Sequence, residues 1–519
     1  MKQQDFTKNP LEEVPAEKFA RLTKEELIEF ALLEQKVRIQ FENEVIYLRA
    51  LNEELKQKSF LFEEQYVTVK NKLFGRSSEK EPRSEDQETS NEDANKKKPK
   101  KQKVQLPSLR YPNASIIERH VELGVLPDCK CCGSQMKDSG MTEDSEFLTV
   151  VPAQFLVVQQ KRHKYSCSKC YGDIKTAPAP PTIKPGSSYS DEMKVDVALG
   201  KYCDLIPTER YSSIAGRAGL SDLPPQSLIE STHQLADFVK GAYDRSRAEA
   251  LLSKLLHADE TPHRMLEGDK KMNWYLWGFS TPRVCFFEIH DTRSGDVASN
   301  ILNLSKCEYL VSDVYSGYGK AVRVANELRK ELGLPLILNV YCNAHSRRKF
   351  KESDAFPEEA QYFIDKYKEI YRLEGEAKGK PPNEILDYRK QMDPIFEEMK
   401  VRAMANIAGY SSKSSIGKAM SYFLENYIGL THFLKISELP IDNNPQERLM
   451  RNPVIGRKTW YGTHSKRGAE TAAILFTLVE SCKLVGVNPR EYFKNLVQDL
   501  HKGKDPYTPW DFKELSKIH

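Results

Sequence analysis

A long amphipathic repeat is the first strong pattern along the chain. Between Lys24 and Leu73 there is no glycine or proline, and large apolar residues recur at steps of three, four or seven: Val37, Phe41, Val45, Leu48, Leu51, Leu55, Phe62, Tyr66, Val69 and Leu73. Such spacing is typical of one apolar face on a helix. At this length it favours a coiled coil that pairs two copies over a helix packed on its own protein. Gly75 suits the C-cap of this helix.

From residue 251 onward, apolar runs of strand length replace the helical pattern. They predict three consecutive strands, a connection and a fourth strand, at 255–259, 273–279, 284–289 and 309–313. This order matches a ribonuclease H-like sheet, in which the first and fourth strands lie side by side. Asp259 ends the first strand before Pro262 stops it, and Asp313 ends the fourth. We therefore expect these two carboxylates to come together.

Helices are predicted around this sheet. Residues 190–250 predict short helices with a break at Leu223–Pro225, which fits a helix-turn-helix as well as ordinary helical packing. Residues 355–437 are mostly helical by composition and too long for a loop, so they predict an inserted helical module. Its helices are expected at Glu358–Leu373, Asn383–Ala405 and Ser415–Leu434.

Composition narrows the class of protein. The 519 residues are 39% hydrophobic and 29% charged, with a formal net charge of +4, which is enough for several domains. No apolar run approaches the roughly 20 residues that cross a bilayer, and the N-terminus lacks the apolar core of a signal peptide. We therefore expect a cytoplasmic protein. Residues 81–105 are acidic and then basic, with no large apolar residue before Val104, and predict a disordered linker.

Cysteine spacing indicates a zinc site. The chain has ten cysteines, too few for a disulfide scaffold, and four of them form the pairs Cys129/Cys132 and Cys167/Cys170. Each Cys-x-x-Cys pair suits a knuckle that presents two thiolates to tetrahedral Zn²⁺, so we expect one structural Zn²⁺ in a zinc-ribbon-like domain. Cys131 and His163 are spare candidate ligands, and reduced cysteines without metal are the alternative.

Three acidic residues are candidates for catalysis: Asp259, Asp313 and Glu447. Magnesium prefers oxygen ligands, and two ions about 4 Å apart can activate the attacking oxygen and stabilise the leaving one in phosphoryl transfer. Each residue also has a structural alternative. Asp259 could cap a helix or turn, and Asp313 could serve a turn. Glu447, three residues after an expected N-cap at Asn444, could complete a capping box.

Cations and aromatic residues gather near two of these positions. This density indicates a nucleic-acid surface, although a solvated helix face would show the same charges in the first group. The candidate DNA-binding residues are His345, Arg347, Arg348 and Lys349 in the first group, and Arg448, Arg451, Arg457, Lys458, Trp460, Lys466 and Arg467 in the second.

These motifs resemble the insertion sequence 66 family of DDE transposases (TnpC type). The resemblance rests on Leu256–Pro262, Ser312–Tyr318, Ala344–Phe350, Asp442–Arg448 and Gly456–Trp460, and it extends to Lys72–Lys80, the paired cysteines and Ala472–Phe493. It implies that Asp259, Asp313 and Glu447 are a DDE triad that binds two Mg²⁺ or Mn²⁺ ions. It also implies that the helical module between Asp313 and Glu447 is the family's insertion.

The resemblance further implies the activity and the partners. A transposase of this family would cleave DNA at the terminal inverted repeats of its own element and join the ends to target DNA. It would act as a homodimer or larger assembly on the bacterial nucleoid, with small accessory proteins encoded beside it. Two alternatives share most of these residues: a catalytically silent DNA-binding protein derived from a transposase, and a ribonuclease H-like nuclease without strand transfer.

We thus predict a multidomain α/β protein with a ribonuclease H-like catalytic core. The expected divisions are a leucine-zipper-like helix at 1–80, the linker at 81–105, a zinc-finger domain at 106–185, a helical region with a candidate helix-turn-helix at 186–250, the catalytic domain at 251–467 with its insertion at about 355–437, and a C-terminal helical region at 468–519.

Overall fold

The computed structural model describes residues 23–74, 106–111, 115–121, 125–137, 144–149, 154–168, 174–266 and 273–517. The chain divides into a larger unit, residues 1–77, 180–208 and 225–519, and a smaller unit, residues 78–179 and 209–224. The predicted linker at 81–105 lies entirely outside the described residues. The expected cap Gly75 and the expected zinc ligand Cys170 also lie outside them.

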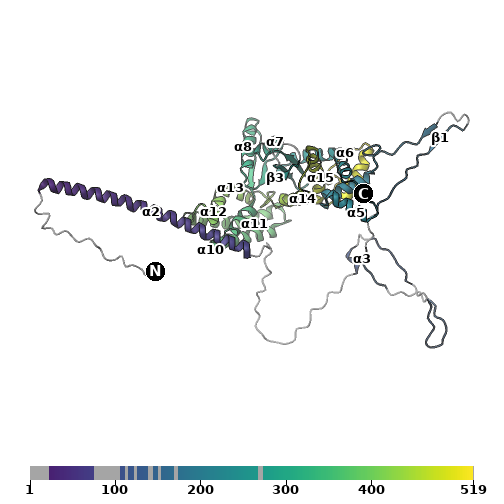
Figure 1. Cartoon of the computed structure of the whole chain (residues 1–519), viewed down its shortest axis with the longest axis horizontal. Coiled ribbons are helices and arrows are strands. Elements are labelled where there is room, and N and C mark those ends of the chain that lie inside the picture. Colours follow the sequence, from purple (N-terminus) through teal and green to yellow (C-terminus); the bar gives the residue numbers. More distant parts are fainter. Residues whose placement is uncertain are drawn as a thin grey trace. The chain divides into compact units, whose positions relative to one another are not determined.

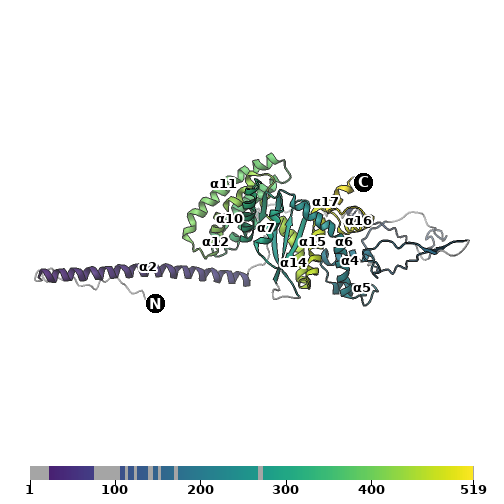
Figure 2. The same cartoon turned by 90° about the horizontal axis from the view of Figure 1, so that it is seen from above.

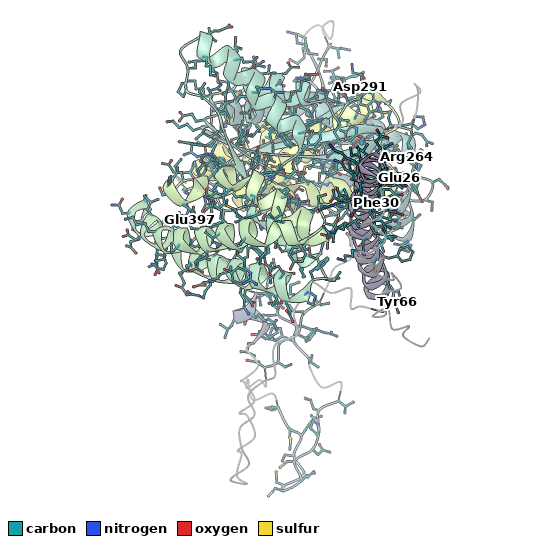
Figure 3. The ribbon with its side chains drawn as sticks, turned by 90° about the vertical axis from the view of Figure 1, so that its left-hand side faces the viewer. Glu26, Phe30, Tyr66, Arg264, Asp291 and Glu397 are labelled. Carbon is teal, nitrogen blue, oxygen red and sulfur yellow. The ribbon has the colours of Figure 1, made fainter. Side chains whose placement is uncertain are left out.

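Helix α2 (Lys24–Phe74) is a single helix of 51 residues, as the periodic pattern predicted (Figure 1). Thr23 and Glu26 cap its start reciprocally: Thr23 N–H donates to Glu26 Oε2 at 2.8 Å, and Glu26 N–H donates to Thr23 Oγ1 at 3.3 Å. The apolar stripe is exposed on the single chain, from 37% for Leu51 to 77% for Phe62. Figure 3 marks a further exposed aromatic residue of this helix, Tyr66.

A five-stranded sheet organises the rest of the larger unit, in the order β5-β4-β3-β6-β7. The first three strands pair antiparallel, whereas β6 runs parallel to β3 and β7 runs parallel to β6. The prediction that the first and fourth strands lie side by side is confirmed, since His257 of β3 pairs with Val311 of β6. The strands are β3 (Leu255–Arg264), β4 (Asn273–Ser280), β5 (Cys285–His290), β6 (Tyr309–Ser312) and β7 (Leu338–Tyr341).

Strand β3 differs from its prediction because it continues through Pro262 to Arg264. Strand β6 borders β3 only from Leu255 to His257, so from Asp259 onward this side of β3 is an edge within the described sheet. An edge is where a sheet tolerates proline, because the missing N–H is not needed there. The same divergence of β3 from β6 leaves room for side chains beside Asp259.

Helices cover both faces of the sheet. Neighbouring residues of a strand point to opposite sides, so each face has its own apolar side chains to bury. Trp277 and Phe286 pack with α7 (Gly295–Asn303) and α8 (Ser316–Glu331) in one core. Leu276 and Phe287, one residue away from each, pack in a second core. The helices of this second core are α4 (Asp191–Tyr202), α6 (Pro225–Leu251), α14 (Asn444–Trp460), α15 (Lys466–Val485) and α16 (Pro489–His501) (Figure 2).

The region expected to hold short helices contains one long one. Helix α6 has 27 residues, and its completely buried Leu235, Ala236 and Val239 lie in the core shared with α4 and α15. This is ordinary helical packing for α6. Helix α5 (Thr208–Arg217), which precedes it, belongs almost entirely to the smaller unit.

The inserted helices lie between α9 (Asn343–Lys351) and α14, and the first two match their predictions. The third expected helix is divided at Asn426, which ends α12 with its Nδ2 donating to Tyr422 O at 2.7 Å. A third core joins these helices to Val311 and Val340 of the sheet. The elements are α10 (Pro357–Ala377), α11 (Pro382–Asn406), η1 (Ile407–Gly409), α12 (Ser415–Glu425), α13 (Tyr427–Thr431) and η2 (His432–Lys435).

The remaining elements are short. The smaller unit contains α3 (Pro107–Arg110) and the antiparallel pair β1 (Lys164–Ser166) and β2 (Ile174–Thr176). Helix α17 (Pro509–Ser516) ends the described part of the larger unit and begins with a capping box between Thr508 and Asp511. Among the described helices, none combines the length and apolar character needed to cross a membrane.

Candidate active site and zinc finger

Asp259 and Asp313 extend from neighbouring parallel strands. Each lies two residues beyond the last matched pair of β3 and β6, His257 and Val311. The pKa of Asp259 is raised to about 8, mainly by burial and in addition by the nearby carboxylates of Glu260, Asp313 and Glu447. Asp313 and Glu447 therefore lie near enough to Asp259 for their charges to act on it, although the ligand atoms of the three acids do not all lie within 4.8 Å of one another.

Asp313 also serves the turn that the sequence allowed as an alternative. Its Oδ1 accepts the backbone N–H of Tyr315 at 3.0 Å, directly before α8 begins. Asp259 Oδ1 accepts the N–H of its neighbour Glu260 at 3.0 Å. These local hydrogen bonds orient both carboxyl groups and are compatible with a second role at the site.

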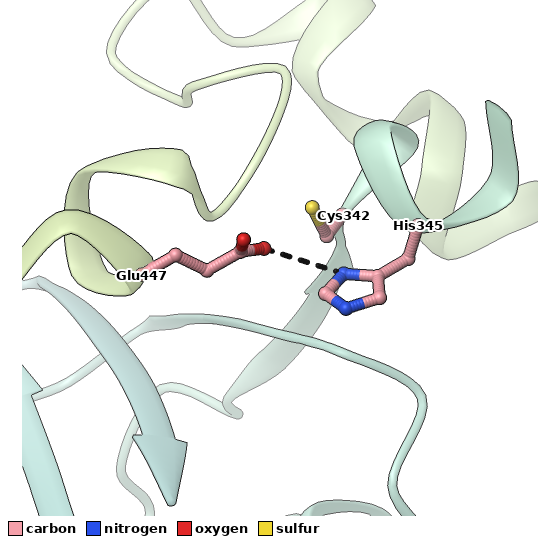
Figure 4. Close-up of side chains that lie close together, drawn as sticks. All are labelled: Cys342, His345 and Glu447. Atoms are coloured by element: carbon pink, nitrogen blue, oxygen red, sulfur yellow. Dashed lines mark ion pairs between the residues drawn. The ribbon is translucent and has the colours of Figure 1, made fainter. Parts of the chain in front are cut away.

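Glu447 comes to the site on α14, and its capping-box alternative is excluded. Asn443 is the N-cap, so Gln446 occupies the third helical position and Glu447 the fourth. Glu447 Oε1 is shielded from solvent and has no hydrogen-bond partner among the described residues. It lies 3.6 Å from His345 Nδ1 (Figure 4). The other carboxylate oxygen, Oε2, lies 3.8 Å from Arg348 Nη2.

Asn443 fixes the start of α14 against the strand that carries Asp259. Its Nδ2 donates to Ala258 O at 2.9 Å, so its Oδ1 is the acceptor for His257 Nδ1–H at 2.8 Å. Burial lowers the pKa of His257 to about 4, which keeps this imidazole neutral. Asn443 N–H also donates to Cys342 Sγ at 3.2 Å. One buried amide thus joins β3, α14 and the start of α9.

Asp442 is the acid nearest to Glu447 in sequence, and its carboxylate makes structural hydrogen bonds. Its carboxylate accepts Asn444 N–H at 3.1 Å, Asn444 Nδ2 at 2.6 Å and the Tyr371 hydroxyl at 3.2 Å. These bonds tie the turn before α14 to helix α10. Asp442 therefore supports the helix that carries Glu447.

Glu260 is a buried site residue that the sequence interpretation missed. Its side chain is 2% exposed and accepts Arg293 Nη2 at 2.6 Å, Arg293 Nε at 2.9 Å and the Tyr318 hydroxyl at 2.5 Å. Burial raises its pKa.

Arg293 lies 4.2 Å above the Tyr315 ring, and the Tyr315 hydroxyl donates to Arg293 O at 2.8 Å. A fixed cation thus holds this second carboxylate beside Asp259. In the sequence, Glu260 was marked only by its position next to Asp259. Side chains alternate between the two faces of a strand, and this alternation alone did not show which of the two acids faces the site.

The basic candidates differ in their surroundings. His345 and Arg348 face Glu447, and Lys349 Nζ lies 4.6 Å from the Tyr422 ring centroid. Arg347 Nε is buried without a hydrogen-bond partner among the described residues. Burial lowers the pKa of Arg457, which is partly covered. The exposed members are Arg448, Arg451 and Lys458 on α14 and Lys466 at the start of α15.

Trp460 and Arg467 make contacts within the protein. The Trp460 ring is nearly parallel to Phe476, with ring centroids 6.4 Å apart, and meets Tyr202 edge-on. Arg467 forms ion pairs with Glu230 at 3.0 Å and with Asp237 at 3.2 Å on α6. The Trp460 ring and the Arg467 guanidinium, which were predicted to bind DNA, thus make these contacts within the protein.

Three of the four expected zinc ligands are described, Cys129, Cys132 and Cys167, and none of the three forms a disulfide bond. Cys129 and Cys132 lie in a tight turn, where Cys129 N–H donates to Ser134 O at 2.8 Å and Gly133 N–H donates to Cys129 O at 2.9 Å. Gly133 has φ +73°, which favours glycine. Hydrogen bonds from Ser134 lower the pKa of Cys132, which favours the thiolate that binds metal. The spare candidates Cys131 and His163 are exposed.

Comparison with known proteins identifies both regions. The model of the transposase IS66 family matches residues 186–471, and that of the zinc-finger binding domain of transposase IS66 matches residues 127–171. Similar proteins occur in Sinorhizobium fredii (strain NBRC 101917 / NGR234). The uncharacterized protein y4hP is 24% identical over 79% of this chain and 78% of its own length, and the uncharacterized protein y4jD is 26% identical over 74% and 78%. Because the first family match covers more than half of the 519 residues, the chain belongs to the IS66 family of transposases.

Proposed function

We propose that the protein is a DDE transposase that cleaves DNA at the ends of its own insertion sequence and joins those ends to target DNA. Asp259, Asp313 and Glu447 are its catalytic residues. The observation that carries the proposal is their convergence from β3, β6 and α14: burial first, and then the charges of Asp313 and Glu447, raise the pKa of Asp259 to about 8. The strand order β5-β4-β3-β6-β7 supports a ribonuclease H-like core.

The donor set fits hard divalent ions. The charges of Asp313 and Glu447 oppose the ionisation of Asp259, so the site favours compensating positive charge, and Mg²⁺ or Mn²⁺ takes oxygen ligands. The buried Glu447 Oε1, which has no hydrogen-bond partner among the described residues, is a further sign that a ligand belongs here. We infer two ions per site, which would supply a hydroxide nucleophile and stabilise the leaving oxygen.

The residues of the chain orient the reaction. Asp259 and Asp313 are fixed by paired strands, and Asn443 locks α14 so that Glu447 faces them. Exposed Arg448 and Arg451, on the helix that carries Glu447, are placed to bind backbone phosphates of the end DNA. Cleavage would release a 3′-hydroxyl, which then attacks a target phosphodiester directly, so the protein forms no covalent intermediate with DNA.

The zinc finger completes the DNA-binding apparatus in this proposal. Cys129, Cys132, Cys167 and Cys170 would hold one structural Zn²⁺, and the preformed turn at Cys129–Gly133 supports that role for the first pair. The inverted repeats of the element and the target duplex are the proposed partners, together with a second copy of the chain and small accessory proteins.

Cleavage and joining of end-containing DNA in the presence of Mg²⁺ test the catalytic proposal. Asp259→Asn, Asp313→Asn and Glu447→Gln should each lower the cleavage rate by about 100-fold or more, because metal stabilisation of the transition state is worth several kcal/mol. DNA binding should persist, since less negative charge faces the phosphates. Glu331→Gln, an exposed acid at the end of α8, is the matched control and should cleave like the wild type.

Three outcomes would contradict the proposal. Full cleavage by any triad variant would remove that residue from the catalytic set. Tight binding without cleavage by the wild-type protein would favour a DNA-binding protein derived from a transposase. Cleavage without joining of a supplied 3′-hydroxyl end would favour a nuclease.

A further inference from the structure

A second set of potential metal ligands adjoins the carboxylates. Cys342 precedes α9 as its N-cap, His345 lies in the first turn of α9, and Glu447 reaches across from α14. One ligand atom from each residue lies within 4.8 Å of the other two (Figure 4). Among the residues that the structure describes, no other three His, Cys, Asp or Glu residues meet in this way.

Two polar atoms of this cluster lack hydrogen bonds. His345 Nδ1 and Glu447 Oε1 are both shielded from solvent, and neither has a partner among the described residues. They face one another at 3.6 Å, which is too long for a hydrogen bond. Buried polar atoms without partners are rare and call for an explanation. Ligands about 2.1 Å from a tetrahedral ion lie about 3.4 Å apart, so one cation between the two atoms would satisfy both.

Cys342 determines which cation fits. Its side chain is completely buried, which raises the pKa of the thiol, and its Sγ accepts the N–H of Asn443 at 3.2 Å, a hydrogen bond that opposes this rise only in part. A set of sulfur, nitrogen and oxygen ligands suits Zn²⁺, whereas Mg²⁺ prefers oxygen alone. Zinc binding would release the thiol proton to solvent and leave a fourth position for water.

We propose that Cys342, His345 and Glu447 form a Zn²⁺ site that is separate from the zinc finger. The inference extends the proposed function, because Glu447 would belong both to this site and to the catalytic carboxylates. A carboxylate held by Zn²⁺ beside His345 is no longer available in full to the ions at Asp259 and Asp313. Zinc would therefore inhibit Mg²⁺-dependent cleavage in competition with Mg²⁺.

Zinc titration of the full-length protein tests the site. The protein would be purified with its finger loaded and dialysed against metal-free buffer, and Zn²⁺ binding would be measured by competition with a chromophoric chelator. The wild type should bind one ion beyond that of the finger. Cys342→Ala and His345→Ala should each weaken this second binding step by about 100-fold or more, through loss of one of three protein ligands. Cobalt titration should show a thiolate-to-cobalt absorption band that Cys342→Ala abolishes.

Matched controls separate this site from other cysteines. Cys307→Ala removes another buried thiol, whose Sγ donates to Tyr309 O at 3.2 Å, and should bind the second ion like the wild type. Cys132→Ser should lose the finger ion alone. If Cys342→Ala fails to fold, His345→Gln carries the test, because the His345 side chain is 29% exposed.

The possible results decide between this site and the catalytic proposal. A wild-type protein that binds only the finger ion, or Cys342→Ala and His345→Gln variants that bind the second ion normally, would overturn the zinc site. Asp259→Asn should lose cleavage but keep the second Zn²⁺, whereas Glu447→Gln should lose both. Failure of catalysis would leave the zinc stoichiometry unchanged, so the two proposals fail independently.

Discussion

At Asp259, burial and the neighbouring carboxylates both oppose ionisation. Its pKa of about 8 in the folded chain compares with about 3.9 for an ordinary aspartate. Between these values the folded state keeps a proton that the unfolded state has lost. The free energy of unfolding contributed by this group therefore falls as pH rises from about 4 to about 8.

The variant Asp259→Asn tests this linkage without any assay of activity. In protein without added divalent ions, the variant should be more stable than the wild type at pH 8 by on the order of a few kcal/mol, and by a smaller amount, about 1.5 kcal/mol, at pH 5. Thermal unfolding at both pH values measures the difference. Mg²⁺ should stabilise the wild type at pH 8 and have less effect on the variant. An equal difference at both pH values would show that Asp259 ionises normally.

Glu260 and Arg293 allow a second test at the residue scale. Arg293→Ala leaves a carboxylate that is 2% exposed with the Tyr318 hydroxyl as its remaining side-chain partner. We expect a loss of about 2–3 kcal/mol, below the range for a fully buried pair because Arg293 is 48% exposed. Glu260→Gln in the Arg293→Ala background should recover part of this loss, since no charge then remains unpaired. Thermal unfolding of the single and double variants measures both effects, and no recovery would contradict the pairing.

At the scale of elements, Gly278 permits the close approach of α14 to the sheet. Gly278 pairs with Asp259 in the β3–β4 register. A Cβ atom at this position would overlap the Gln446 amide and lie 2.6 Å from Met450 Sδ. Gly278→Ala should therefore push the first turns of α14 outward, lowering stability by about 1–3 kcal/mol and displacing Glu447.

The measurement for Gly278→Ala combines unfolding with cleavage at a temperature where the variant is folded. Cleavage should fall further than the fraction of folded protein. Gly319→Ala on α8 is the control, because its added Cβ has nothing within 4 Å and should keep both properties. Normal cleavage by Gly278→Ala would show that the helix does not need this approach.

The elements that depend on local periodicity could be predicted, and the features that depend on distant partners could not. The long helix and four strands follow from spacing within the sequence, whereas the adjacency of β3 and β6 was predicted from the match of the strand order to a ribonuclease H-like sheet. The continuation of β3 through Pro262 depends on where β6 ends. The N-cap is Asn443, and its side chain bonds to His257 and Ala258, almost 190 residues away. Glu260 escaped notice because its partner Arg293 lies on a separate loop.

At the scale of the whole molecule, α2 presents an exposed apolar stripe, which we expect a second copy of the chain to cover. Its side chains at Leu48, Leu51 and Leu55 are 54%, 37% and 56% exposed. A helix of 51 residues with this repeat pairs most readily with a second copy of itself, because both copies carry the same stripe. A transposase must hold two element ends in one complex, and a dimer formed through α2 would meet that need.

Removal of residues 1–80 tests the pairing of α2, and point substitutions separate it from other effects of truncation. The truncated chain should show a lower molar mass in light scattering at micromolar concentration. Leu48→Glu combined with Leu55→Glu should weaken association similarly, because two charges would enter each apolar seam. Arg49→Glu, an exposed charge next to the stripe, should associate like the wild type. An unchanged mass for both the truncated chain and the Leu48→Glu/Leu55→Glu chain would place the dimer interface elsewhere.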